Sequence, residues 1–236
     1  MVSFPDLPVS NAVDHILSLS PSRKGLISII YDSLCNISPS SLQDVRRLWE
    51  GDLGVELTDD QWRAALALIH TSSLARHSVM QLKVVLRVHL TKSRLAKIFP
   101  EVDPTCPRCK GQPADHLHMF WSCPKLATFW ASIFGAYSEM LRKNITPDPL
   151  SALFGTAIEN RPLIAFTSRL ARRLILLSWK DQKPPSFTRW IRDVMHFLKL
   201  EKIRYILKGS MQTFREVWAP FLEYYESLQT PLDTDD

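Results

Sequence analysis

The spacing of three cysteines and one histidine, C-x2-C-x8-H-x4-C, constrains this chain more than any other feature. The four residues are Cys106, Cys109, His118 and Cys123. Structural Zn²⁺ takes four tetrahedral nitrogen or sulfur ligands, and three cysteines with one histidine are a usual set. Two cysteines separated by two residues can reach one ion from a single turn. The pattern therefore predicts a structural zinc site, closed to water because the protein supplies all four ligands.

The fourth ligand has a competitor, because His116 lies seven residues before Cys123. The spacing favours His118, with His116 as the alternative. A helical turn from Asp115 is expected to present His118. On a continuous α-helix Cys123 would point roughly 140° away from His118. We therefore expect the helix to end near Ser122, where the following proline supplies a break.

The same residues allow a reading without metal, in which a reduced C-x-x-C pair has histidines nearby by chance. The N-terminal residues Met1–Asn11 have no basic residue ahead of an apolar run, so no secretory signal is expected. Outside a secretory context, clustered cysteines favour a metal site over disulfides. Cys35 lies apart from the pattern within an apolar run, and we expect it to be a buried small hydrophobe.

Helical spacing dominates the rest of the chain, which has only 7 glycines. Thr58 and Gln61 form a capping-box pattern that opens a helix through Trp62 and Ile69. Further helices are expected at Leu26–Leu34, Leu74–Leu90, Thr91–Phe99, Pro124–Lys143, from Pro162 to a break at Lys183–Pro185, from a Ser186 cap to Lys208 with Gly209 as C-cap, and Ser210–Leu228. The helix from Pro162 has an apolar stripe at Leu163, Phe166, Leu170, Leu174 and Leu177, and Ile175 lies on another face, so we expect this helix to be contacted from two sides. The prediction is a mainly α fold: a multi-helix domain with a small irregular zinc-binding insert that holds the three cysteines and the histidine.

The expected organisation has five segments. They are an N-terminal lead at 1–24, a helical segment at 25–100, the zinc-binding insert at 101–125, a C-terminal helical segment at 126–228 and an acidic tail at 229–236. Residues 25–228 are expected to fold as one cooperative unit. The chain has 236 residues with 45% hydrophobic and 22% charged side chains, a globular balance. Its apolar stretches fall far short of the ~20 residues that cross a membrane.

The positive charge of the chain is concentrated in its middle. The overall net charge is +5, but residues 76–208 alone carry 23 basic and 9 acidic side chains, a net +14, between two acidic ends. Such asymmetry suits a polyanion such as nucleic acid. The candidate contacts are two helical stripes and the cysteine turn. The first stripe is Arg76, Lys83, Arg87 and Arg94, and it loses Arg94 if the helix breaks at Thr91. The second is Arg169, Arg172, Arg173 and Lys180, and the cysteine turn adds Arg108 and Lys110. The alternative is an ordinary solvated or salt-bridged surface.

Two aromatic residues beside the histidine, Phe120 and Trp121, have two readings as well. They can stack on exposed bases. They can also pack as core under the metal site, which the sequence favours.

Taken together, several motifs resemble a known family. The run Gln81–Leu95 is followed by Phe99-Pro100, by Cys106-Pro107-Arg108-Cys109 and by His118–Pro124 with Phe129-Trp130. This resembles the C-terminal zinc-binding region of LINE-type non-LTR retrotransposon reverse transcriptases, downstream of the polymerase core. The resemblance covers about residues 25–226. A threonine-proline is common in that family where this chain has Thr91-Lys92.

The resemblance implies a role in holding the element's RNA or its target DNA during target-primed reverse transcription. It implies Cys106, Cys109, His118 and Cys123 as zinc ligands, the polymerase core of the same element as a partner, and a location in cytoplasm and nucleus. The tyrosine-x-aspartate-aspartate segment of the polymerase is absent from the sequence. We therefore expect a non-catalytic chain without a small-molecule substrate. The alternative is a zinc-stabilised protein–protein interaction module that does not bind nucleic acid.

Overall fold

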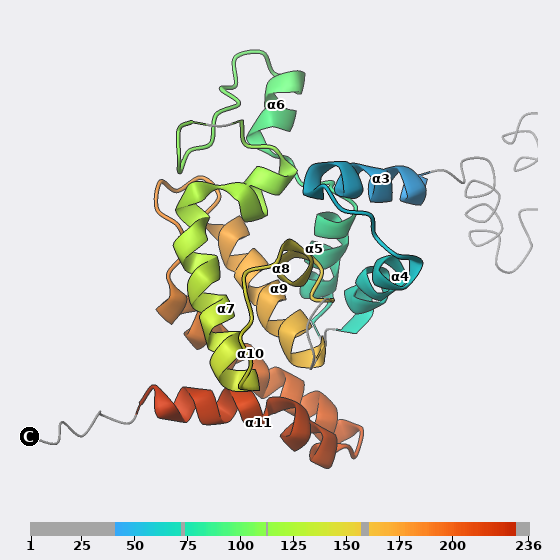
Figure 1. Cartoon of the computed structure of the whole chain (residues 1–236), viewed down its shortest axis with the longest axis vertical. Helices are drawn as coiled ribbons and strands as arrows, with labels where there is room; N and C mark the ends of the chain where they lie inside the picture. Colours follow the sequence, from blue (N-terminus) through green and yellow to red (C-terminus); the bar gives the residue numbers. More distant parts are fainter. Residues whose placement is uncertain (1–40, 72–73, 112, 157–160, 230–236) are drawn as a thin grey trace, which may run out of the picture. The chain divides into compact units, whose positions relative to one another are not determined.

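The computed structural model describes residues 41–71, 74–111, 113–156 and 161–229. These residues form a mainly α structure, as the periodicity predicts (Figure 1). The α-helices are α3 (Ser41–Leu53), α4 (Asp59–Ala67), α5 (Ala75–Val85), α6 (Lys92–Ile98), α7 (Ala127–Leu141), α8 (Pro149–Leu153), α9 (Arg161–Leu177), α10 (Phe187–Leu207) and α11 (Met211–Ser227). Shorter turns of other helix types are η1 (Leu68–Thr71), η2 (His118–Ser122) and η3 (Pro124–Leu126).

Contacts divide the chain into two compact units, one ending at Gly51 and the other beginning at Asp52. The helices from α4 onward all belong to the second unit. The expected helix at Leu26–Leu34, the reading of Cys35, the lead at 1–24 and the tail from residue 230 lie outside the described residues. The five-segment organisation stays a prediction.

Helix α9 is at the centre of the second unit. It contacts α5, α8, α10, α11 and η2. Its predicted stripe is buried at Leu163, Leu170 and Leu174, and Ile175 on another face is also buried. This confirms a helix packed from two sides. Leu177, which the stripe included, is instead 55% exposed, because α9 ends there and the core no longer covers it.

An aromatic cluster joins α7 to α10. Trp130, Phe134 and Tyr137 follow one another along the buried face of α7 at ring-centroid distances of 5.4–6.3 Å. Tyr137 also meets Trp190 of α10 edge-on at 6.2 Å. Such edge-to-face contacts add to the hydrophobic effect of burying large rings. The cysteine-histidine insert contacts this cluster, because the ring of Trp121 lies 5.8 Å from that of Trp130 between centroids.

The predicted helix starts are confirmed where a side-chain cap was named. The Thr58 hydroxyl accepts from the backbone N–H of Gln61 at 3.2 Å, and the Gln61 side chain accepts from the N–H of Thr58 at 2.8 Å. Ser186 caps α10, and Gly209 follows it with a positive φ of 63°. Thr91 caps α6. These caps satisfy the otherwise unpaired N–H groups of the first turn.

One helix is shorter than predicted. Helix α5 ends at Val85 instead of Leu90, and Arg87 adopts a left-handed backbone with φ of 56°. The chain turns here, and the next helix, α6, begins after its cap residue Thr91. Because α5 and α6 are separate, Arg94 does not continue the row of basic residues on α5. The predicted stripe from Arg76 to Arg94 is therefore broken by the turn.

We expect Thr58→Ala to lower the free energy of unfolding by about 1 kcal/mol, because it leaves the N–H of Gln61 without its acceptor. The matched control is Thr213→Ala on the exposed surface of α11, which we expect to change stability by less than about 0.5 kcal/mol. Urea denaturation followed by circular dichroism compares the two. Equal midpoints for both variants would show that the capping box contributes nothing measurable.

Candidate metal centre

The first two cysteines lie in a tight turn that follows α6. The N–H of Lys110 donates to the carbonyl of Cys106 at 2.9 Å, and Lys110 has a positive φ of 60°. The ends of the turn are closed by an isolated antiparallel bridge between Thr105 and Pro113. This closure aims the side chains of Cys106 and Cys109 to the same side. The turn therefore places two sulfurs where both can reach one ion.

The histidine and the last cysteine lie at the two ends of η2, which is a π-helical turn. The Asp115 carboxylate accepts from the N–H of His118 at 2.7 Å and fixes where this turn begins. A π-helix bonds residue i to residue i+5, so it is wider than an α-helix. His118 and Cys123 are five residues apart. The expected helix end at Ser122 is confirmed. Because the π-helical turn is wider, the angle about the helix axis between the side chains of His118 and Cys123 is smaller than it would be on an α-helix.

The structure brings all four predicted ligands together. Their ligand atoms lie within 4.8 Å of one another. Cys106 Sγ is 3.8 Å from Cys123 Sγ, and Cys109 Sγ is 3.3 Å from His118 Nε2. A tetrahedral ion with Zn–S bonds of about 2.3 Å separates two sulfurs by about 3.8 Å and a sulfur from a nitrogen by about 3.5 Å. The cluster can therefore hold a metal ion.

The three thiols are free, and no two of them form a disulfide. Burial raises the pKa of Cys123 to about 11, and the neighbouring Cys106 adds to the rise. Burial also lowers the pKa of His118, which favours the neutral imidazole that a metal needs. A buried set of thiols gives up its protons when a cation replaces them, so metal binding is coupled to proton release.

His116 does not belong to the cluster. Its Nε2 lies 3.1 Å from the carbonyl oxygen of Val84 in α5. The ring is buried and packs on Phe120 and His89 at centroid distances of 5.1 and 6.1 Å. Of the two histidines, His118 is the one with its ring nitrogen beside a cysteine sulfur. His116 instead ties the insert to α5, a structural role that the sequence did not indicate.

Burial of His116, with the positive charge of Arg87 nearby, lowers its pKa from 6.5 to about 3. The unfolded chain therefore takes up a proton near pH 6.5, whereas the native chain does not until near pH 3. Stability is lost as the pH falls through this window, by up to about 1.4 kcal/mol per pH unit for one proton. We expect the non-titrating variant His116→Gln to lose less stability than wild type between pH 6.5 and 4 in urea denaturation. Parallel pH profiles would contradict this.

Two further hydrogen bonds hold the π-helical turn. Trp130 Nε1 of α7 donates to the carbonyl of Phe120 at 2.9 Å. Arg108 donates to the carbonyl of Met119 at 3.1 Å. Phe120 is fully buried, so it belongs to the core, whereas Trp121 is half-buried. Hydrogen bonds therefore join the π-helical turn both to α7 and to the cysteine turn.

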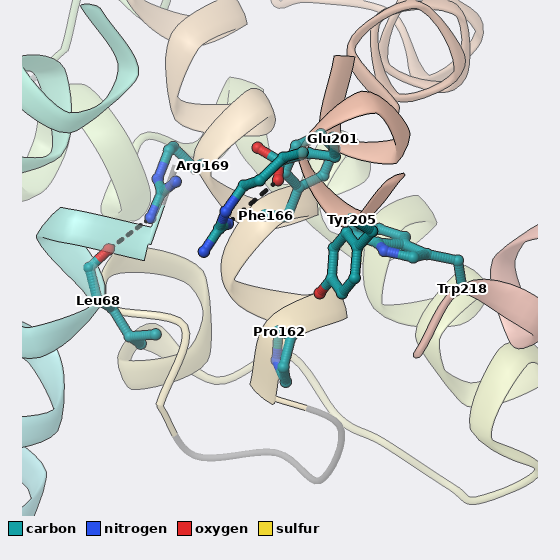
Figure 2. A pocket seen from close by; sticks show the side chains of 8 residues that line it. Leu68, Pro162, Phe166, Arg169, Glu201, Tyr205 and Trp218 are labelled. Carbon is teal, nitrogen blue, oxygen red and sulfur yellow. Dashed lines mark hydrogen bonds and ion pairs between the residues drawn. The ribbon is translucent and has the colours of Figure 1, made fainter. Parts of the chain in front are cut away.

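Three of the basic residues predicted to contact nucleic acid are buried. Arg108, Arg169 and Arg172 are 5%, 2% and 1% exposed, and their guanidinium groups donate to backbone carbonyls. Arg169 donates to the carbonyl of Leu68 at 2.6 Å, and both residues line a cavity of about 190 Å³ (Figure 2). The prediction that these three lie on a phosphate-binding surface is wrong. Helical spacing identifies a shared face but does not say whether another helix covers it.

The other predicted contacts are at least partly exposed. Arg76, Lys83, Arg94 and Lys110 are exposed. Arg87 is half-buried in an ion pair with Asp52, and half-buried Arg173 pairs with Asp193 at 2.7 Å. Arg173 also lies 5.0 Å from the ring centre of Phe197. Of the second stripe, Arg173 is therefore already paired with an acidic residue, and Lys180, just past the end of α9, is exposed.

Among the described residues, no helix is both long enough and apolar enough to cross a membrane. A scan of the chain against protein-family models finds no match.

Proposed function

We propose that this chain is the zinc-binding, non-catalytic, nucleic-acid-binding C-terminal region of a LINE-type retrotransposon reverse transcriptase. The observation that carries the proposal is the cluster of Cys106, Cys109, His118 and Cys123. It lies in a basic part of the chain, and the motifs around it are those that resemble the family. The partner would be RNA or DNA, with the polymerase core of the same element as a further partner in cytoplasm and nucleus.

Zinc is the metal that fits this donor set. Three thiolates with one imidazole are typical of structural zinc sites, whereas Mg²⁺ and Ca²⁺ prefer oxygen ligands. Four protein ligands leave no position for a reactive water. The site would therefore stabilise the insert, with no part in a reaction.

The exposed cations supply the attraction to phosphates. Lys110 stands in the cysteine turn itself, and Lys83 and Arg94 stand on α5 and α6, which the insert contacts through His116 and Ala114. Each phosphate that such a group neutralises releases counterions, so binding weakens as salt rises. The three buried arginines take no part in this surface.

Titrations into labelled single-stranded RNA and, separately, into DNA of the same sequence, at 50 and 200 mM salt, with and without a chelator, test this function. We expect binding that weakens steeply with salt and is lost when the metal is removed. The double variant Lys83→Glu/Lys110→Glu should bind several-fold more weakly and show a shallower salt dependence. Lys202→Glu/Lys208→Glu, which changes two exposed lysines in the C-terminal half of α10 and just after it, is the control for net charge. Absence of RNA and DNA binding at low salt would overturn the proposal.

The second candidate is a protein-interaction module, which the end of α10 favours. Leu200, Ile203, Ile206 and Leu207 are 37–82% exposed and lie within two turns. Exposed apolar patches of this kind mark protein interfaces. A folded, metal-loaded chain that binds no nucleic acid at low salt would leave this candidate in place.

A further inference from the structure

A groove of about 440 Å³ opens beside the cysteine turn. Three separate segments line it: the start of α6 with the loop that follows, the cysteine turn, and the residues just past the end of α9. The lining residues are Lys92, Leu95, Val102, Pro107, Trp179 and Lys180. This volume lies within the range of sites that hold small organic groups.

The groove is positioned by the same contacts that build the metal centre. Thr91 caps α6 and so places Lys92 as its first residue. The N–H of Ser93 donates to the carbonyl of Ala114 at 3.2 Å, which ties α6 to the insert. Pro107 lies between the two cysteines of the turn. The wall that Pro107 forms therefore depends on the four ligand residues being held together.

The lining combines an aromatic ring, apolar walls and two lysines. Leu95, Val102, Pro107 and Trp179 are all half-buried, so part of each surface faces the groove or solvent. Lys180 Nζ lies over the ring of Trp179, 5.4 Å from its centre, and Lys92 comes from another of the three lining segments. The nearby Asp103 carboxylate accepts from the N–H and the hydroxyl of Thr105 at 2.9 and 2.5 Å. An aromatic face beside cations matches a base joined to a phosphate.

We propose that this groove holds an unpaired nucleotide of single-stranded nucleic acid, with the base against Trp179 and the backbone phosphates at Lys92 and Lys180. The proposal rests on the proposed function and names the contact site for it. An entirely apolar partner would offer no negative charge to the two lysines, of which Lys92 already has the Asp103 carboxylate nearby. A duplex keeps its bases paired and cannot place one against the indole. The groove therefore selects single strands over duplexes.

Fluorescence anisotropy on the full chain tests the groove with a labelled 12-nucleotide RNA, a DNA of the same sequence and the matching duplex. We expect Trp179→Ala to weaken binding of the single strands about tenfold or more, while Trp179→Phe keeps most of it. Lys92→Glu/Lys180→Glu should weaken single-strand binding and flatten its salt dependence. Tyr225→Ala on α11 and Lys202→Glu/Lys208→Glu are the matched controls, because none of these residues lines the groove.

Each outcome decides between the two proposals. Weakening by the groove variants but not by the controls supports the groove, and equal losses on RNA and DNA would assign it to both. Salt-dependent binding that the groove variants leave unchanged would overturn the groove and leave the proposed function standing. A wild-type chain that binds none of the three probes at 50 mM salt would overturn both. Zinc content and circular dichroism show whether Trp179→Ala is folded, and the lysine variant decides the matter if it is not.

Discussion

Replacing Cys109 with serine is expected to abolish stoichiometric metal binding and to unfold the insert. The sulfur of Cys109 lies 3.3 Å from His118 Nε2, within a cluster that spans 4.8 Å. A serine hydroxyl is a poor ligand for a soft thiolate site. Without the metal, the cysteine turn loses the bonds that would tie it to His118 and Cys123, and it keeps the Thr105–Pro113 bridge and the Arg108 hydrogen bond to Met119. We expect a loss of more than about 4 kcal/mol in unfolding free energy, because loss of a metal is one of the mechanisms that produce effects this large.

Metal analysis and limited proteolysis measure this effect. Cleavage should appear first within residues 101–117, in the loop that carries the turn. Cys35→Ala is the control, because this cysteine lies outside the C-x2-C-x8-H-x4-C pattern and alanine is also a small apolar residue. Retention of one metal per chain and full protease resistance in Cys109→Ser would show that this ligand is dispensable.

Replacing Arg172 with alanine is expected to destabilise the helix bundle by about 3–5 kcal/mol. Its guanidinium donates to Gln81 Oε1 of α5 at 2.7 Å and to the carbonyl of Ala152 in α8. Burial lowers its pKa to about 9, which leaves it cationic at neutral pH. The alanine variant removes both hydrogen bonds, leaves two buried acceptors unpaired and opens a cavity. The side chain thus joins α5, α8 and α9.

Thermal or urea denaturation compares this variant with Arg192→Ala, which truncates an exposed arginine of α10. The control should change stability by less than about 0.5 kcal/mol. Nucleic-acid binding by Arg172→Ala, measured at a temperature where the variant is folded, should match wild type because the guanidinium is buried. Wild-type stability combined with weaker RNA binding would contradict this structural role and restore Arg172 to the binding surface.

The elements that the sequence predicts well are those decided by local chemistry. The capping box at Thr58, the Ser186 cap and the left-handed Gly209 each depend on a few adjacent residues. The metal ligands are equally local, because Cys106, Cys109, His118 and Cys123 lie within 18 residues and only a small number of turns bring them together. The mainly α fold follows from repeated apolar spacing.

The features that sequence reasoning missed depend on partners distant in the chain. Arg169 and Arg172 share a helical face as predicted, but Leu68, Gln81 and Ala152 turn that face into an interior. Nothing in the spacing of α9 reveals those partners. The early end of α5 likewise involves a partner distant in the chain, because α6 is hydrogen-bonded to the Ala114 carbonyl through the N–H of Ser93. The structural role of His116 depends on the Val84 carbonyl, 32 residues earlier.

The central claim is that one zinc ion, held by three sulfurs and one nitrogen, organises the insert. X-ray absorption spectroscopy at the zinc edge, combined with metal content per chain, tests it most directly. We predict one zinc per chain with three sulfurs at about 2.3 Å and one nitrogen at about 2.0 Å. A chain that is fully folded and carries no zinc, or a zinc bound through oxygen ligands alone, would contradict the claim.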